Sequence, residues 1–389
     1  MKRQKTADLT PHVQNNLKAF RSKRGLSQGQ LAVQSGITRQ AVSSIEANLY
    51  LPATAVALRL ASVLNCTVED LFRLVPADDV TDGVLLEPST LPDTVSSPIR
   101  VKVSTVGTRT VVRPVAGLGE ILSYTVPADG YVVEHHRQGA DHKVRVKLSR
   151  EREAIAQEIS VAGCDPAIFL AGEHLRRRND RTTVVGWTMG SVAAVQALQR
   201  GEVHVAGLHL FDPVTGESNL PFLRRTLKGS AYQVITFAAW EEGFLVRPGN
   251  PKSIRTAADL AEPSVMLANR EEGAGARVLL DQRLRAAGIE SSQVQGYDRI
   301  VRSHVDVARA IAEHRADVGI GIRSVAHVFR LEFVPLQTAR YDLVVPNAYL
   351  KSHPTLANLF ETLTSRPFRT EIDALGGYDT HDTGTIHPL

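Results

Sequence analysis

Helical periodicity of apolar residues dominates the first 75 positions of the chain. One stripe at the spacing of an amphipathic helix consists of Val13, Leu17 and Phe20. A second stripe lies in residues 57–64, and Thr67 is placed to cap a last short helix. Between the stripes, residues 27–47 read SQGQLAVQSGITRQAVSSIEA. The pattern predicts an all-α domain of short helices over residues 1–75.

Residues 27–47 predict two helices joined by a tight turn. Ser27 and Gln30 have the spacing of a capping box, and Gly36 suits the left-handed end of the first helix. Thr38 is placed to cap the second helix and is also a candidate DNA contact. The outer side of that helix carries Arg39, Gln40, Ser43 and Ser44. Side chains of these types reach phosphates and base edges from a helix in the major groove, so the segment is typical of a DNA-binding helix-turn-helix.

The charge distribution supports DNA binding by this domain. Residues 1–76 contain ten Lys and Arg against four Asp and Glu, whereas the whole chain has a net charge of only +4. A basic domain on a near-neutral body is expected where nucleic-acid contacts are confined to one part of a protein. The length of 389 residues allows two or three domains, so most of the chain serves another purpose.

Residues 76–98 are predicted to be a linker, because they include four prolines and five acidic residues without Lys or Arg. The period then changes to strand-like alternation, which predicts a small, mostly antiparallel β-rich module over residues 99–150. His135, His136 and His142 in this module invite a metal-binding interpretation. Neighbouring strand residues face opposite ways, however, and no cysteine or second spaced pair accompanies them. We therefore predict exposed strand histidines.

The remainder of the chain alternates strands, short polar loops and helices. Strands are expected at 159–162, 183–187 and 203–207, and a second unit of the same kind, starting with a strand at 265–268, is expected at 265–322. This order predicts a two-lobed α/β domain, with loops at the carboxyl edge of parallel strands, where ligands of such sheets bind. The loops lack GxGxxG and a Walker lysine, so a dinucleotide or ATP is not indicated.

Two hydroxyl side chains mark one of these loops. Thr188 and Ser191 stand where a predicted strand passes into a helix, beside helix N–H groups that suit a small anion. Plain helix capping accounts for one such hydroxyl better than for two hydroxyls three residues apart.

Two family resemblances follow from these motifs. Residues 13–72 resemble the lambda-repressor-like (XRE-type) DNA-binding domain, which implies that Gln28 meets the DNA backbone and that Gln40 lies on the recognition helix. Residues 159–385 resemble the type II periplasmic solute-binding fold, most closely in bacterial one-component regulators related to molybdate- and tungstate-binding proteins. The motifs that carry the second resemblance are WTMGSVAAVQAL, AGLHLFDPVTG, NREEGAGAR, HRADVGIGI and LGGYDTHDTG.

The second resemblance implies a cleft in which loop hydroxyls and backbone N–H groups hold an oxyanion. The positions that it assigns to the ligand are Cys164, Asp165, Thr188, Ser191, Arg270, Gly273, Ala274, Gly275, Ser303 and Tyr341. Arg270 would add charge and bidentate geometry. The chain departs from the related loops at Cys164 and Asp165, and at Ala274 and Ala276, where hydroxyls are missing. Asp165 would either repel an oxyanion or cap a helix that starts at Pro166.

These observations predict a cytoplasmic, ligand-responsive transcription regulator without a catalytic, metal or cofactor site. The expected order is the DNA-binding domain, the linker, the β-rich module and a ligand domain over residues 151–389. Because one helix-turn-helix reads only a few base pairs, we expect a homodimer on double-stranded operator DNA. No apolar run reaches transmembrane length, no signal peptide opens the sequence, and the two cysteines fit a reducing compartment.

The ligand and the function class each keep an alternative. The expected effector is an oxyanion such as molybdate or tungstate, and the alternative is another small molecule. The other function class is an α/β enzyme that uses His209, His304, Asp165 or Cys164. Against an enzyme, the sequence alone assembles no set of nucleophile, base and orienting group.

Overall fold

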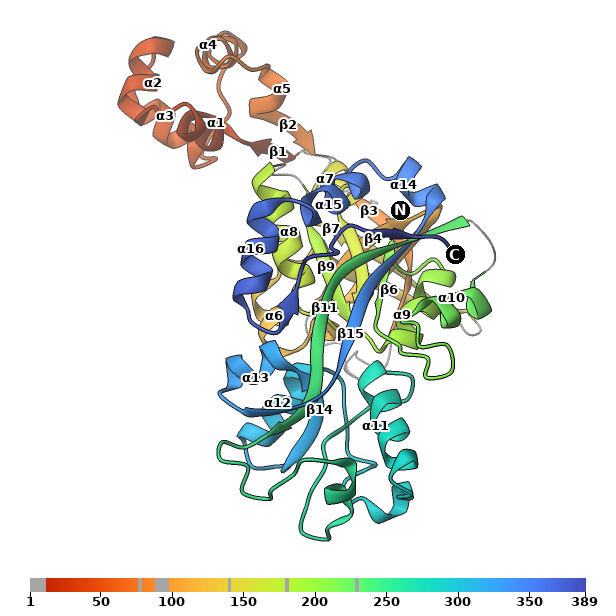
Figure 1. The fold of residues 1–389 in the computed structure, drawn as a ribbon. Helices are drawn as coiled ribbons and strands as arrows, with labels where there is room; N and C mark the ends of the chain where they lie inside the picture. The colour runs from red at the N-terminus through yellow and green to blue at the C-terminus, as the bar shows by residue number, and fades with distance from the viewer. Residues whose placement is uncertain (1–11, 76–78, 88–97, 139–140, 179–181, 228–230) are drawn as a thin grey trace, which may run out of the picture. The chain divides into compact units, whose positions relative to one another are not determined.

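The computed structural model describes residues 12–75, 79–87, 98–138, 141–178, 182–227 and 231–389. The chain divides into two compact units, Met1–Thr81 and Asp82–Leu389 (Figure 1). Within the described residues, no helix is both long enough and apolar enough to cross a membrane.

The first unit is a bundle of short helices with a two-stranded antiparallel sheet. Its helices are α1 (Leu17–Lys23), α2 (Gln28–Ser35), α3 (Arg39–Glu46), α4 (Thr54–Leu64) and α5 (Val68–Leu71). Its strands are β1 (His12–Asn15) and β2 (Phe72–Val75). The predicted helix signals are confirmed, because Ser27 and Gln30 form the capping box and Gly36 has a φ of 64°. The Thr38 hydroxyl accepts a hydrogen bond from the Ala41 amide at 3.1 Å.

One part of the helical prediction is wrong. Val13 belongs to β1 and pairs with Leu74, so it does not extend the apolar stripe of α1. The core of this unit is formed by apolar residues from several helices, including the fully buried Leu17, Leu31 and Ile45. Val13 fits the strand because a β-branched side chain suits extended backbone as well as it suits an apolar helix face.

A closed barrel begins the second unit, in the strand order β3-β5-β4-β6-β7. Its strands are β3 (Val80–Leu85), β4 (Ile99–Val106), β5 (Arg109–Pro114), β6 (Gly130–Gln138) and β7 (Asp141–Leu148). The 3-10 helix η2 (Val115–Leu118) and the helices α6 (Glu120–Thr125) and α7 (Arg152–Ala156) accompany it. Alternating strand residues such as Val101, Val103 and Val146 fill the interior.

The barrel corrects the predicted linker over residues 76–98. Residues 80–85 of that segment form β3, in which Val84 lies opposite Val111 of β5 in a parallel pairing. The apolar and β-branched residues of β3 supply a strand despite the acidic and proline-rich neighbourhood. Residues 76–78 and 88–97 lie outside the described part of the chain.

The α/β part is built on one sheet in the order β14-β11-β15-β10-β8-β9, to which β16 and β17 add by pairing with β11. The strands are β8 (Ile159–Gly163), β9 (Val184–Thr188), β10 (Val205–Leu208), β11 (Tyr232–Val246), β14 (Val318–Ile322), β15 (Glu332–Pro346), β16 (Tyr378–Asp379) and β17 (Ile386–His387). A separate parallel pair consists of β12 (Asn269–Arg270) and β13 (Ile300–Val301). The expected strand at 265–268 is therefore shifted, and only Leu267 makes an isolated bridge there.

Two long antiparallel strands connect the two lobes of this part. β11 and β15 each have 15 residues and run through both lobes (Figure 1). We call residues 242–337 the second lobe, and residues 159–241 with 338–389 the first lobe. Helices of the first lobe are α8 (Ile168–Arg178), α9 (Ser191–Gln199), α10 (Leu220–Thr226), α14 (Asn347–Ser352), α15 (Leu356–Leu363) and α16 (Arg366–Ala374). Those of the second lobe are η4 (Ala257–Ala261), α11 (Gly275–Ala286), η5 (Ser291–Gln293), α12 (His304–Ala312) and α13 (Arg323–Phe329).

Candidate functional site

The outer side of α3 carries the residues expected to face DNA. Arg39, Gln40 and Ser43 are exposed, and Ser44 is half-buried. The Gln28 side-chain amide, at the start of α2, donates a hydrogen bond to Glu46 at 2.9 Å. The contact joins the first residue of α2 to the last residue of α3, so the two helices of the motif are held to each other.

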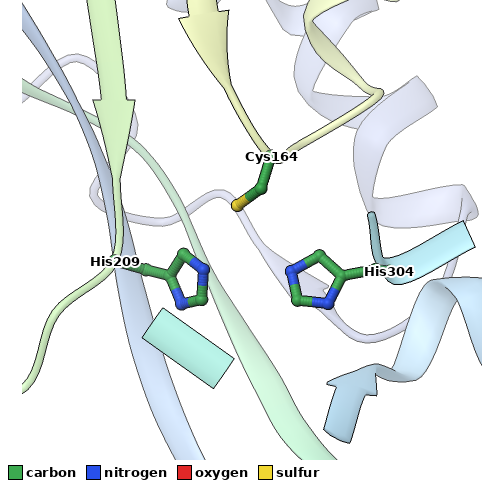
Figure 2. A group of neighbouring side chains, drawn as sticks. All are labelled: Cys164, His209 and His304. Carbon is green, nitrogen blue, oxygen red and sulfur yellow. The ribbon is translucent and has the colours of Figure 1, made fainter. Parts of the chain in front are cut away.

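Three side chains with metal-binding or nucleophilic chemistry converge between the two lobes (Figure 2). Cys164 directly follows β8 and His209 directly follows β10, so both belong to the first lobe. His304 is the first residue of α12 in the second lobe. Their sulfur and ring nitrogen atoms lie within 4.8 Å of one another, and all three residues are buried. We call these three residues the Cys–His–His cluster.

His209 is held by a carboxylate on its far side. Its Nδ1 lies 2.8 Å from Oε1 of Glu242, and Glu242 also accepts a hydrogen bond from the Gln337 side chain at 3.0 Å. Burial alone would lower the pKa of His209, but Cys164 and Glu242 outweigh it and raise this pKa to about 10. The Trp240 ring packs edge-on against the His209 imidazole with their centroids 5.0 Å apart.

The Tyr341 hydroxyl fills the space at the carboxyl ends of β8 and β10. A Cβ atom on Gly163 would lie 2.1 Å from this oxygen, and one on Gly207 would lie 1.9 Å from it. Both strands therefore need glycine where they pass the phenol. Burial raises the pKa of Tyr341 well above its ordinary value, although the backbone amides of Cys164 and Asp165 act in the opposite direction. The Tyr341 hydroxyl thus takes up space beside the loop that the oxyanion interpretation assigns to a ligand.

Asp165 has the geometry of a capping residue. Its Oδ1 accepts hydrogen bonds from the Ala167 amide at 2.9 Å and from the Tyr378 hydroxyl at 2.8 Å. Burial raises the pKa of Asp165 to about 6 against the opposing effect of these two hydrogen bonds. The helix α8 begins at Ile168, two residues later than the expected start at Pro166. The carboxyl group serves the turn that leads into this helix.

Arg270 places a buried guanidinium in the second lobe. It is 1% exposed, and its Nε and Nη2 atoms both donate to the Glu271 carboxylate at 2.9 Å. Its Nη1 atom has no hydrogen-bond partner among the described residues.

The remaining predicted loop residues are in structural positions or exposed. Ser191 is buried and its hydroxyl accepts the His209 amide at 3.1 Å, whereas Thr188 is exposed. The Ser303 hydroxyl caps α12 by accepting the Asp306 amide at 2.9 Å. Ala274 is buried beside the first turn of α11.

Two glycines bring the lobes into direct contact. A Cβ atom on Gly273, whose φ is +80°, would lie 2.9 Å from the Val192 side chain. A Cβ atom on Gly275 would lie 2.1 Å from the carbonyl oxygen of His209. The lobes therefore meet with backbone against backbone, and the Cys–His–His cluster is enclosed.

Polar atoms without partners collect around this enclosed space. Among the residues that the structure describes, they include Asp165 Oδ2, Trp240 Nε1, Arg270 Nη1 and both ring nitrogens of His304. Burial lowers the pKa of His304 well below its ordinary value, as do Arg270 and His209, and the Ile320 carbonyl opposes this only in part. Buried polar groups are normally satisfied, so such a concentration is typical of a binding site.

Sequence reasoning missed three members of this site. Trp240, Glu242 and Tyr378 lie on β11 and β16, and no motif distinguishes them in the sequence. His209 and His304 were visible only as candidates for an enzyme. The signal available in the sequence was the position of each histidine at the end of an element. His209 directly follows the strand β10, and His304 is the first residue of the helix that follows β13.

The histidines of the barrel lie apart from this site. His135 Nε2 and His142 Nδ1 are 3.0 Å apart on neighbouring strands, and their rings stack. His135 and His136 are exposed and His142 is half-buried. The pair is a useful exposed comparison for the buried Cys–His–His cluster.

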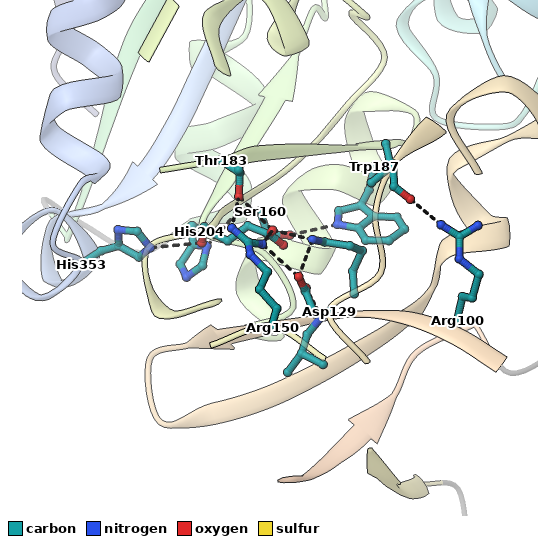
Figure 3. Close-up of polar contacts among 12 residues, drawn as sticks. Arg100, Asp129, Arg150, Ser160, Thr183, Trp187, His204 and His353 are labelled. Atoms are coloured by element: carbon teal, nitrogen blue, oxygen red, sulfur yellow. Dashed lines mark hydrogen bonds and ion pairs between the residues drawn. The ribbon is translucent and has the colours of Figure 1, made fainter. Parts of the chain in front are cut away.

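A buried polar network joins the barrel to the first lobe (Figure 3). Lys102 Nζ lies 2.8 Å from Asp129 and 2.6 Å from Glu158, and Arg150 contacts the same two carboxylates at 2.9 and 2.7 Å. The two cations and two anions thus compensate one another. Removal of any one of them would leave an uncompensated charge and destabilise the fold. Nearby, His204 accepts the Ser160 amide on Nδ1 at 3.0 Å, with Nε2 2.9 Å from the Thr105 carbonyl of the barrel.

Comparisons with known proteins agree with these two parts of the chain. Residues 17–71 match the helix-turn-helix family, and residues 172–364 match the PBP superfamily domain. The uncharacterized protein YvgK of Bacillus subtilis is 32% identical over 228 residues, which cover 59% of this chain and 73% of that protein. The chain belongs to the PBP superfamily. It joins a helix-turn-helix transcription-regulator domain to a PBP-like ligand-binding domain, as the sequence predicts.

One further sequence and one solved structure are similar to parts of this PBP-superfamily chain. The uncharacterized HTH-type transcriptional regulator YgzD of Bacillus subtilis is 36% identical over 62 residues, 16% of this chain and 94% of that protein. A phosphate-bound putative phosphate-transporter substrate-binding protein from Clostridium perfringens has a TM-score of 0.44 at 10% identity, covering 57% of this chain and 98% of that one. A similarity at that level does not indicate the ligand.

Proposed function

We propose that this chain is a cytoplasmic transcription regulator whose affinity for operator DNA depends on a small effector enclosed between its two lobes. The observation that carries the proposal is the collection of buried polar atoms without partners around the Cys–His–His cluster, in a chain with a DNA-binding domain. An effector that binds the closed lobes better than the open ones shifts the population toward closure. In a homodimer, closure changes how two recognition helices are presented to two half-sites.

The proposed effector class is an oxyanion such as molybdate or tungstate. In its favour, Arg270 Nη1 and Trp240 Nε1 are buried donors without partners among the described residues. His209 adds positive charge when it is protonated. The alternative, another small molecule, has its own support, because the Tyr341 hydroxyl takes up space beside the Cys164–Asp165 loop and Ala274 and Ala276 offer no hydroxyl.

Calorimetric titration of molybdate, tungstate, sulfate and phosphate into the purified full-length protein tests this effector class. At least one of the anions should bind, and R270Q should weaken its binding by about 10- to 150-fold, since a hydrogen bond to a charged group contributes about 1.5–3 kcal/mol. R285Q on the exposed side of α11 is the matched control and should bind as the wild type does. If none of the four anions binds, the oxyanion proposal fails.

One observation favours a second candidate function, an enzyme. His209 lies between Cys164 and Glu242 and interacts with both. This is the spatial order of a nucleophile, a base and an orienting carboxylate. A catalytic thiol must meet its substrate, so the open form of the protein should be alkylated rapidly at Cys164 by iodoacetamide. Labelling of Cys164 no faster than that of the half-buried Cys66, located by mass spectrometry, would dismiss this candidate.

A further inference from the structure

We infer that the Cys–His–His cluster binds a transition-metal cation of the Zn²⁺ type through one thiolate and two imidazoles. Two ligands, Cys164 and His209, come from the first lobe, and the third, His304, comes from the second lobe. A metal held in this way ties the lobes together in the closed form. The inference deepens the proposed function by naming a cation that binds in the same cleft. Only the effect of the metal on DNA binding rests on the proposed function.

The donor atoms are of the right kind and close enough. Sulfur and imidazole nitrogen are the ligands that Zn²⁺ prefers, at about 2.0–2.3 Å from the metal, which puts tetrahedral ligand atoms roughly 3.5 Å apart. The three atoms already lie within 4.8 Å of one another, so side-chain rotations suffice to bring them to that spacing. Figure 2 shows the Cys164 sulfur and both rings directed into one common space.

The surroundings of His209 resemble the outer shell of a metal site. Ligating histidines almost always donate their second ring N–H to a carboxylate or carbonyl, which fixes the tautomer and the ring orientation. Glu242 Oε1 lies 2.8 Å from Nδ1, at ion-pair distance but without hydrogen-bond geometry, and Gln337 donates to the other carboxylate oxygen of Glu242. With Glu242 beside Nδ1, we assign Nε2 of His209 to the metal.

The environment of His304 differs from that of an ordinary core histidine. It is 0% exposed, and the geometry gives neither ring nitrogen a well-formed hydrogen bond to any described residue. A histidine buried only to fill space would be expected to satisfy at least one nitrogen. Its ring lies 5.6 Å from that of His209, centroid to centroid, although the two come from opposite lobes.

Carboxyl groups near the cluster can balance the charge of a cation. Glu242 contacts His209, Asp165 follows Cys164 in the chain, and Glu271 is paired with the Arg270 guanidinium. His209 must bind the metal in its neutral form, so metal binding releases its proton. A deprotonated Cys164 would add a further negative charge that a divalent cation neutralises. The cation is compatible with the oxyanion proposal, because a metal with three protein ligands keeps a fourth position for an exogenous ligand.

Titration of Co²⁺ into the chelator-treated full-length protein tests the inference. Cobalt reports a sulfur ligand through a thiolate-to-metal charge-transfer band, and Zn²⁺ should abolish the band by competition. We expect the band in the wild type and in C66S, its loss in C164S, and at least tenfold weaker Co²⁺ binding in H304Q. E242Q should weaken binding by about 10- to 100-fold, as loss of an outer-shell partner does. Circular dichroism checks that each variant is folded.

Three results would overturn the inference. No band in the wild type, or a band that survives both C164S and H304Q, removes the site. Co²⁺ binding that gives no charge-transfer band and is lost in H142A instead assigns the metal to the histidine pair on the barrel, which has no sulfur ligand. The proposed function fails separately, because metal binding is read without DNA and oxyanion binding is read on metal-free protein. If the metal binds and operator affinity is unchanged, the site stands and the coupling does not.

Discussion

Replacement of Gly275 by alanine should act as a wedge between the lobes. The added Cβ would lie 2.1 Å from the His209 carbonyl oxygen and 2.5 Å from its ring carbon Cε1, whereas ordinary contacts begin at 3.4 Å. The second lobe must therefore retreat by roughly 1 Å or the closed form must carry the strain of an overpacked contact, which typically costs about 1–3 kcal/mol. The φ of Gly275 is not in the left-handed region, so the backbone itself accepts alanine.

The expected cost appears in ligand binding and not in folding. Alanine at a helix position gains up to about 1 kcal/mol over glycine, and this gain applies to open and closed forms alike. If closure loses about 1–2 kcal/mol, the affinity for a cleft ligand falls by roughly 5- to 30-fold, since 1.36 kcal/mol is a factor of ten. Thermal unfolding of the ligand-free protein should stay the same or rise slightly.

Calorimetry with Zn²⁺ and with molybdate, measured in parallel on G275A and the wild type, is the assay. G29A is the matched control, because Gly29 also lies in the first turn of a helix and its Cβ would meet nothing closer than 3.9 Å. That variant should bind both ions as the wild type does. Equal or tighter binding of every cleft ligand by G275A would refute the closed arrangement on which the argument depends.

The remaining predictions concern DNA, pH and assembly. Q40A should weaken binding to a selected operator by about 1–3 kcal/mol through loss of a base contact, and unchanged binding by both Q40A and R39A in fluorescence anisotropy would dismiss the recognition helix. Burial and the neighbouring His353 lower the pKa of His204 to about 4. The unfolded chain therefore takes up this proton first, and up to about 3 kcal/mol of stability should be lost as the pH falls from about 6.5 to 4; urea unfolding should show this slope in the wild type and a flatter one in H204Q, and equal slopes would contradict it. Sedimentation velocity should give a homodimer, and a monomer both free and on DNA would exclude the dimeric arrangement.

Local chemistry made the first domain predictable. Ser27, Gly36 and Thr38 define helix ends by short-range hydrogen bonding and backbone conformation, and the structure has those ends. Such signals act over three or four residues, so a single sequence is enough to read them. Val13 was misassigned because its partner is Leu74 of β2, about sixty positions away, and local periodicity carries no record of that pairing.

The site was predictable only in part, for the same reason. Cys164 and Asp165 could be placed at the end of a parallel strand, where ligands of open sheets bind. The sequence could not show that the Tyr341 hydroxyl would lie at the ends of β8 and β10, because its position depends on the register of β15 against β10. Nor could the sequence show that Glu242 would lie next to His209, because that contact depends on where the long strand β11 places Glu242.

The measurement that tests the central claim most directly is the affinity for operator DNA with and without the cleft ligand. An operator is first selected from a randomised DNA pool with the full-length protein, and its affinity is then measured by fluorescence anisotropy in the presence of chelator, of Zn²⁺ and of molybdate. The account predicts a change of about 5- to 150-fold with the ion that calorimetry shows to bind, the usual range of coupling between two sites. The change should be smaller in G275A at the same ion concentration. Equal operator affinities with and without a bound ion would contradict the claim that the cleft controls DNA binding.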